Sequence, residues 1–252
     1  MAGYSFRFGE EFSDEIGLRV EGTPDLGTAQ RDGELISIPG KDGDEYIDYG
    51  RYKNVEFSLN VAVVQKGIKT VRDLIDDIIN SYAYLYGYQY FEDSDHFNLS
   101  TEAVLTNFGE FKRELRRLGK ATLKFSRKPF WYDVTGLQFT DVSLAPETPT
   151  KVLDNPFKLT AKPIFIFTPA SGAPSFFTIR IATGDTITDY NYTTVNSLPL
   201  TVDCEKETAK IGSAKFDFSI PTGFEPGETT ISIVSGKSNL SSVQLAPRWR
   251  CL

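Results

Sequence analysis

The sequence is poor in the residue types that build most metal and redox sites. Its 252 residues include one histidine, one methionine and two cysteines. The cysteines, Cys204 and Cys251, lie 47 positions apart, and neither has a second cysteine or a histidine nearby, so a zinc cluster is excluded. Two free thiols are the favoured interpretation, and a disulfide stays open because spacing does not test its geometry.

Long apolar segments and a strong basic charge are also missing. No run of about 18 apolar residues occurs, and Met1–Ser5 has no apolar signal core, so we expect no membrane span, no secretory leader and synthesis in a cytoplasm. The net charge is −7, with 17 basic and 23 acidic residues through Asp133 and 10 and 11 beyond it. Since lysine and arginine supply most of the affinity for phosphates, we expect no specific nucleic acid as a partner.

The residues that could support chemistry do not form a recognisable catalytic motif. The single histidine, His96, lies on a predicted loop without a Gly-x-Ser-x-Gly turn, so a structural role is favoured over a Ser-His-Asp triad. The acidic residues 42–48 lack the offsets of a calcium-binding EF-hand, and no glycine-rich phosphate loop occurs. None of the 34 acidic residues is singled out as a glycosidase pair. We therefore expect no enzyme activity, no metal and no cofactor.

The residues that are abundant favour β-sheet. Aromatic residues reach 13% of the chain, and 40% of the residues are hydrophobic against 24% charged, as in a folded globular protein. Alternating patterns predict strands at residues 4–8 and, most clearly, at 54–63. Between them, Ile36 and Ile38 lead into the glycine-rich turn Pro39–Asp44, which predicts a hairpin or an extended arm.

One amphipathic helix is predicted after the second of these strands. Apolar residues recur there every three or four positions, at Ile68, Val71, Ile75, Ile78 and Tyr82. Thr70 and Asp73 supply the chemistry of an N-terminal cap. Residues 82–91 then carry five tyrosines and one phenylalanine, which could form an aromatic platform for a sugar or a base. We favour the alternative, that they pack against the sheet beneath the helix.

A basic segment follows at Lys112–Lys128, where eight of the 17 residues are lysine or arginine. Basic residues beside aromatic ones can bind nucleic acid, but no such motif is present. We favour a solvated strand face, or a surface that meets the acidic arm of a neighbouring subunit. The candidate interface residues are Asp42, Asp44, Glu45, Asp48, Arg113, Arg116, Arg117, Lys120 and Lys124.

The composition changes near Asp133, which predicts a boundary between two domains, 1–133 and 134–252. Beyond it, prolines are closely spaced and no helical periodicity is present. Short β-strand patterns separated by glycine turns predict a β-sandwich, with candidates at residues 164–167, 176–181, 200–204, 215–220 and 229–234.

The order of these features resembles one family, the distal tail protein (Dit) of long-tailed phages and prophages (siphophages) of Gram-positive bacteria. In the first half, Ile38–Gly43 is similar to the family's Pro-Gly-Arg-Asp-Gly turn, and the strand 121–125 leads to a Lys-Pro-aromatic signature at Lys128. Arg127 stands where the family often has cysteine. In the second half, the similar motifs are Asn155-Pro156, Ala161–Ile164, Val202–Glu205 and Pro247–Arg250.

The resemblance implies a structural protein of the virion's tail tip, or baseplate. The first domain is then a β-sandwich-like, hexamerisation domain with one α-helix and an extended arm, and the second is a galectin-like β-sandwich. The implied hexameric ring connects the major tail protein to the tail-associated hub protein and to receptor-binding or baseplate proteins, for virion assembly and host attachment.

Two other functions compete with this one. A carbohydrate-binding module for host cell-wall polysaccharide is the alternative, but galectin sugar sites need a stacking tryptophan with histidine, asparagine and arginine donors. The second half offers only Trp249 and no histidine. A cell-wall hydrolase is the third possibility, and we expect no such activity.

Overall fold

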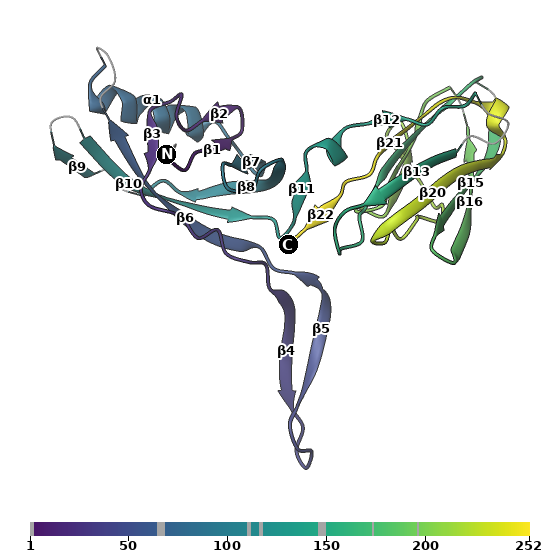
Figure 1. Cartoon of the computed structure of the whole chain (residues 1–252), viewed down its shortest axis with the longest axis horizontal. Coiled ribbons are helices and arrows are strands. Elements are labelled where there is room, and N and C mark those ends of the chain that lie inside the picture. The colour runs from purple at the N-terminus through teal and green to yellow at the C-terminus, as the bar shows by residue number, and fades with distance from the viewer. Residues whose placement is uncertain are drawn as a thin grey trace. The chain divides into compact units, whose positions relative to one another are not determined.

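The computed structural model describes residues 3–64, 69–109, 112–115, 118–145, 150–172, 174–195 and 197–252, with the backbone only at 64 and 112–115. The chain divides into two compact units, Met1–Trp131 with Leu252, and Tyr132–Cys251. Both consist mainly of antiparallel strands (Figure 1). Within these ranges, no helix has the length and apolar character needed to cross a membrane.

The first unit is built on one antiparallel sheet. Its strand order is β2 (Glu11–Phe12), β1 (Phe6–Phe8), β7 (Gln89–Asp93), β8 (Leu99–Asn107), β10 (Leu118–Arg127), β6 (Val55–Val64) and β3 (Leu18–Val20), with β9 (Lys112–Leu115) also paired to β10. Strand β6 confirms the clearest prediction, since Phe57, Leu59 and Val61 are buried and alternate with exposed residues. Opposite Phe57, strand β10 places Phe125, and their rings stack at 5.2 Å. This pair lies in the aromatic core of the unit.

The predicted helix is present as α1 (Val71–Ala83) and covers β6 and β10. Thr70 accepts a hydrogen bond from the Asp73 amide, and the Asp73 carboxylate accepts one from the Thr70 amide, so the expected capping box is confirmed. The helix buries Val71, Ile78 and Tyr82. A side chain at Gly119 of β10 would approach Val71 closely, so this glycine permits the close packing of helix on sheet. Ile68, which the helical pattern included, lies outside the described residues.

The expected arm is a separate two-stranded sheet, β4 (Arg31–Ser37) and β5 (Asp44–Tyr52). The hairpin extends away from the main sheet of its unit (Figure 1). At its tip, Gly40 and Gly43 have φ of 84° and 80°, a region of backbone space that favours glycine. The glycine-rich turn therefore closes the hairpin.

The second unit is a sandwich of two antiparallel sheets, as the sequence predicts. One has the order β12 (Thr140–Asp141), β21 (Leu240–Ala246), β14 (Ile164–Pro169), β17 (Leu200–Asp203), β18 (Thr208–Ile211) and β19 (Ala214–Phe216). The other has the order β13 (Thr150–Asn155), β20 (Gly227–Ser235), β15 (Ser175–Thr183) and β16 (Thr186–Thr194). Between them lies a core that includes Phe165, Phe167 and Phe177. The strand predicted at 215–220 ends at Phe216, because the chain then turns inward and Tyr192 donates a hydrogen bond to the Ser219 carbonyl.

Four short elements complete the chain. They are β11 (Trp131–Asp133), the 3-10 helices η1 (Thr135–Leu137) and η2 (Lys237–Asn239), and β22 (Arg250–Cys251). Neither Cys204 nor Cys251 forms a disulfide, as favoured from the sequence. Burial raises the pKa of the Cys204 thiol to about 12.

Candidate assembly surfaces

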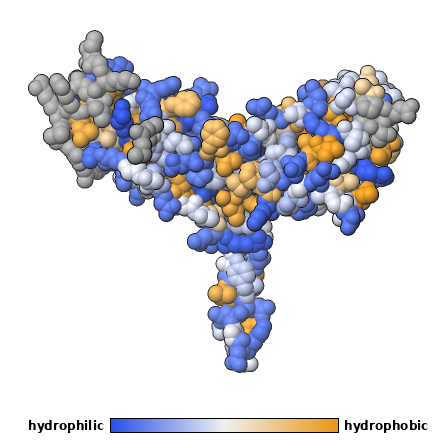
Figure 2. Space-filling view, viewed as in Figure 1, coloured by the Kyte–Doolittle hydropathy of each residue, from blue (hydrophilic) through white to orange (hydrophobic). Residues whose placement is uncertain are grey.

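The arm exposes large apolar side chains on both of its faces. Leu35 and Tyr46 pair across the two strands on one face, and Ile36 and Ile47 lie on the other. All four are exposed, and hydrophobic residues are visible among hydrophilic ones along the arm in Figure 2. An isolated two-stranded hairpin is marginally stable in water, and its apolar side chains here have no core of their own. The arm is therefore suited to burial against another chain.

Most charges on the arm are already neutralised within it. Arg31 Nε lies 2.6 Å from Asp48 Oδ2, and Lys41 pairs with Glu45. The amide of Gly50 and the Arg31 guanidinium both donate to Asp48 and lower the pKa of its carboxyl. The other two predicted interface acids of the arm, Asp42 and Asp44, form no ion pair with a described residue. These two predicted interface acids lie at the tip of the arm, where their carboxylates can meet a partner's cation.

Three of the five basic residues predicted to meet the arm lie on β9 and β10. Lys120 Nζ lies 2.8 Å from Glu21 Oε1, whereas Lys124 is exposed on β10 and forms no ion pair with a described residue. Arg113 belongs to β9, where only the backbone is described, and Arg116 and Arg117 lie outside the described residues. No ion pair between described residues joins these bases to the arm of the same chain. Their predicted meeting with the arm of another copy stays a prediction.

Arg127, at the departure from the family motif, has a structural role. Its side chain is 1% exposed and donates to the carbonyls of Leu26 and Gly27, at 3.4 and 2.7 Å, and to those of Lys128 and Pro129. The guanidinium also lies over the Trp131 ring, 5.1 Å from its centroid. The Arg127 guanidinium therefore links the loop at Leu26 and Gly27 to strand β10, and its burial makes it unavailable to a partner.

The tyrosine-rich segment differs from the prediction. Tyr82 is buried, but Tyr84, Tyr86 and Tyr88 are exposed, so the expectation that these residues pack beneath the helix is wrong for the three. The helix ends at residue 83 and β7 begins at Gln89, so the three exposed tyrosines lie in the connection between them. Exposed tyrosines are enriched at protein interfaces. Their exposure could not be read from the pattern, since aromatic residues are abundant in buried strands too.

The single histidine is structural, as expected. The His96 ring stacks on Trp131 with centroids 4.2 Å apart, and its Nδ1 lies 3.0 Å from both carboxylate oxygens of Asp93. Asp93 also accepts from the Tyr4 hydroxyl at 3.1 Å. All groups that bind this carboxylate come from one loop and the N-terminal segment, and no serine nucleophile contacts His96 among the described residues.

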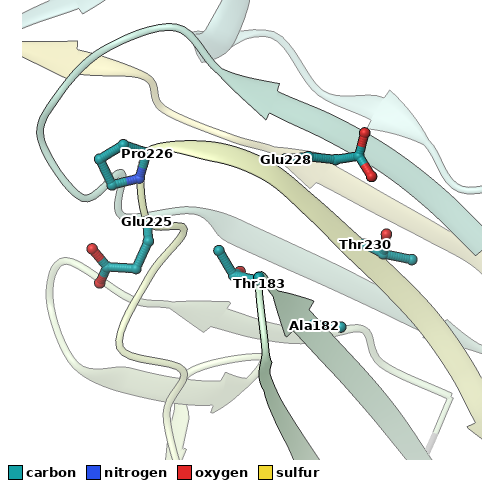
Figure 3. A pocket seen from close by; sticks show the side chains of 7 residues that line it. Ala182, Thr183, Glu225, Pro226, Glu228 and Thr230 are labelled. Carbon is teal, nitrogen blue, oxygen red and sulfur yellow. The ribbon is translucent and has the colours of Figure 1, made fainter.

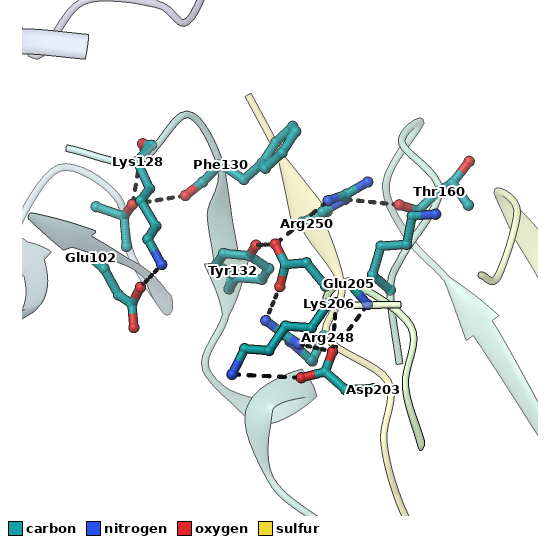
Figure 4. Close-up of polar contacts among 12 residues, drawn as sticks. Glu102, Lys128, Phe130, Tyr132, Thr160, Asp203, Glu205, Lys206, Arg248 and Arg250 are labelled. Atoms are coloured by element: carbon teal, nitrogen blue, oxygen red, sulfur yellow. Dashed lines mark hydrogen bonds and ion pairs between the residues drawn. The ribbon is translucent and has the colours of Figure 1, made fainter. Parts of the chain in front are cut away.

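In the second unit, two of the motifs that carry the resemblance meet in one cluster (Figure 4). Arg248 donates to Asp203 at 3.3 Å and to Glu205, and Glu205 accepts from the Tyr132 hydroxyl at 2.6 Å. Burial and the Glu205 charge raise the pKa of Tyr132, so the phenol stays protonated. The cluster joins the start of the unit to its last strands. In the first unit, the same figure shows Lys128 paired with Glu102.

The surface of the second unit offers no sugar-stacking platform at the expected place. Trp249 is only 8% exposed and packs against Phe224, with centroids 6.0 Å apart. A hollow of about 450 Å³ lies at the ends of β15 and β20 (Figure 3). Its lining has no aromatic or basic side chain and consists of Ala182, Thr183, Gly184, Glu225, Pro226, Glu228 and Thr230. This lining provides no aromatic ring on which a sugar could stack.

Comparison with solved structures identifies the fold. No family model and no curated protein sequence matches the chain. Among solved structures, it is similar to the SPP1 Dit protein, described as a paradigm of the hub adsorption apparatus in phages that infect Gram-positive bacteria. The TM-score is 0.67, at 14% identity over 100% of both chains. A chain of the phage p2 baseplate in its activated conformation matches with a TM-score of 0.49, at 10% identity over 97% of both chains. On the full-length match to SPP1 Dit, the predicted resemblance is confirmed for the fold: the chain has the mainly β fold of a phage distal tail protein.

Proposed function

We propose that this chain is a non-enzymatic structural protein of a phage tail tip that forms a hexameric ring. The ring would connect the major tail protein of the tube to the tail-associated hub protein and to receptor-binding or baseplate proteins. The observation that carries the proposal is the likeness to SPP1 Dit over the whole of both chains. In this assignment, Met1–Trp131 forms the ring and Tyr132–Cys251 is the galectin-like domain at its periphery.

The arm supports ring formation independently of that likeness. A ring of identical subunits needs two different, complementary faces on each subunit. The arm supplies one face, because Leu35 and Tyr46 are exposed opposite each other with no core beneath them. Burying a large apolar side chain contributes about 1.5–3 kcal/mol. Two such side chains on each arm therefore make a substantial contribution to closing the ring.

The charges suggest how the arm meets the next subunit. Asp42 and Asp44 at the arm tip have no ion-pair partner among the described residues, and neither does Lys124 on β10. We propose that these unpaired charges face each other between neighbouring subunits. The sequence also predicts Arg113, Arg116 and Arg117 as part of this interface.

Light scattering on the purified chain tests the ring. We expect a mass about six times the 28.2 kDa of one chain, alone or after addition of the tail partners. The double variant Leu35→Ser, Tyr46→Ser should lower this mass toward that of one chain. The matched control is Phe97→Ser, which removes an exposed aromatic of the same unit outside the arm and should leave the ring intact. A monomer at every concentration, with and without partners, would contradict the proposal.

Charge exchange tests the contact between arm and neighbour. The double variant Asp42→Lys, Asp44→Lys should weaken the ring at low salt, because it places lysines against Lys124. Adding Lys124→Glu should restore it, and both effects should diminish at about 1 M salt, where screening is strong. If Lys124→Glu does not restore the ring, the arm tip meets another surface.

Sugar binding by the second unit is the weaker alternative. Trp249 is buried against Phe224, so it offers no ring for a sugar to stack on. Titration of the full chain with host cell-wall polysaccharide measures this directly. We expect no saturable binding, and saturable binding that survives the arm variants would favour the carbohydrate-binding alternative.

A further inference from the structure

Strand β16 (Thr186–Thr194) differs from the other edge strands of the second unit. Exposed edges invite pairing with other chains, and proteins protect them with short strands, lysine or proline. β12 and β19 have two and three residues. Edge strand β13 carries Lys151, which donates to Thr140 and Asp141, and it is flanked by prolines in the sequence. These three edges are protected.

By these criteria β16 is unprotected. It has nine residues, contains no lysine, proline or glycine, and pairs with β15 along its whole length without a bulge. In an antiparallel strand, about half of the backbone N–H and C=O groups point away from the paired neighbour. Within the described part of the chain, β16 pairs with β15 alone, and no other backbone hydrogen bond reaches it. Its outer edge is therefore open to a further strand.

The side chains of β16 leave this edge accessible. Tyr190 and Tyr192 point into the sandwich, where the Tyr192 ring contacts the loop beyond β19. On the outer face, Ile187 is 63% exposed. Asp189, the only charged residue of the strand, is held back toward β15 by two hydrogen bonds from Arg180, at 2.7 and 2.8 Å. The one charge that could repel an incoming strand is thus drawn toward its neighbour.

The rows of outward side chains define what the incoming strand must carry. One row runs across the sheet from Val152 through Thr230 and Ala182 to Ile187, so a β-branched residue fits next to Ile187. The next row ends at the open edge with the Asp189 carboxylate. A lysine or arginine beside Asp189 would extend its pair with Arg180, whereas an acidic residue there would be repelled.

We propose that β16 is a docking edge for an extended, arginine- or lysine-bearing segment of another protein, which adds to this sheet as a fifth strand. In this mode of recognition, main-chain hydrogen bonds provide affinity and alternate side chains provide specificity. The site lies entirely in the second unit and does not depend on the arm. It therefore gives the tail-tip protein a binding surface separate from the proposed ring contacts.

Hydrogen exchange on the full chain tests the edge. The probe is a nine-residue peptide that alternates threonine and valine around a central arginine. At about ten times its Kd, it should slow exchange of the β16 amides about tenfold and leave β13 unchanged. A peptide with central glutamate should bind more weakly, and one with prolines flanking the centre should not protect β16. Absence of protection, or equal protection by the proline peptide, would overturn the proposal.

Two lysine variants supply the matched comparison. Ile187→Lys places a protective lysine on the open edge and should abolish the peptide effect. Val152→Lys places the same residue in the same row at the opposite, protected edge, where the native side chain is 56% exposed, and should keep the effect. Equal responses of both variants would overturn the proposal. So would concentration-dependent protection of β16 without peptide, because that assigns the edge to a second copy of this chain.

The ring and the edge can fail separately. Ile187→Lys should leave the mass of the assembly measured by light scattering unchanged, since β16 is distant in sequence from the arm and belongs to the other unit. Failure of the peptide to bind, with the mass of the assembly unchanged, would contradict the docking edge alone. Loss of the ring, with β16 still protected by the peptide, would contradict the proposed function alone.

Discussion

Replacing Arg127 by methionine should destabilise the first unit strongly. The methionine fills much of the space of the aliphatic stem but donates no hydrogen bond to the carbonyls of Leu26 and Gly27, which Arg127 joins to the sheet from about one hundred positions away. The bond to Leu26 is buried and the bond to Gly27 is partly buried, and a buried carbonyl left without a donor costs about 1–3 kcal/mol. The lost cation–π contact with Trp131 adds about 1 kcal/mol. Because methionine avoids the cost of burying a charge, we expect a net loss of about 3 kcal/mol.

Tryptophan fluorescence measures this loss in one unit. The chain has two tryptophans, Trp131 in the first unit and Trp249 in the second, so a Trp249→Phe background reports on the first unit alone. Urea unfolding of Arg127→Met in that background should show a free energy of unfolding about 3 kcal/mol lower. In a thermal scan this corresponds to a decrease in Tm of about 10 °C.

The matched control is Arg72→Met on helix α1. Its guanidinium is 86% exposed and lies 3.9 Å from Asp76, and such surface pairs contribute about 0–1 kcal/mol. The control should therefore change stability by less than about 0.5 kcal/mol. If Arg127→Met loses as little stability as the control, the carbonyls of Leu26 and Gly27 have found other donors and the expected loss is wrong.

Three further predictions concern glycine, tyrosine and cysteine. Gly236→Ala should lower the free energy of unfolding by more than about 3 kcal/mol, because φ is +69° and the new Cβ would lie 2.1 Å from a backbone carbonyl oxygen. The control Gly184→Ala has φ +54° and open space around the new Cβ, so it should cost about 1 kcal/mol. Urea unfolding measures both. Tyr82→Phe should be neutral or raise stability by about 1 kcal/mol, because this buried hydroxyl has no hydrogen-bond partner among the described residues. At pH 8 a thiol reagent should modify Cys251 in the folded chain and Cys204 only after unfolding. Burial raises the pKa of Cys204 from its usual 9 to about 12, so the contribution of this thiol to the free energy of unfolding should fall as the pH rises through this range. Urea titrations at several pH values measure this fall.

Most elements of the fold could be predicted from local pattern. Alternation identified β6, the three-and-four spacing with Thr70 and Asp73 identified α1, and the glycine turn at Pro39–Asp44 identified the arm. These signals are readable because side-chain periodicity and capping depend on neighbours within a few residues. The strand predicted at 215–220 was too long because its last residues pack inward against Tyr192, a contact with a distant strand.

The surfaces were less predictable. Charge pattern marked Asp48 and Glu45 as interface residues, but the hairpin register pairs Asp48 with Arg31, and Lys41 neutralises Glu45. The same pattern grouped Arg127 with surface bases, although it is buried among carbonyls. Composition gives the sign of a charge without its partner, because pairing depends on which strands become neighbours.

Local patterns in the sequence predict two mainly β units, one helix, an arm, and an order of motifs that resembles the distal tail proteins. Which surfaces remain available depends on the tertiary structure. It buried Trp249, exposed Tyr84 and Tyr86, and left β16 at the end of its sheet with an open edge. The physical reason is that strand formation depends on local periodicity, whereas the exposure of a side chain or an edge depends on which distant strand, if any, packs beside it.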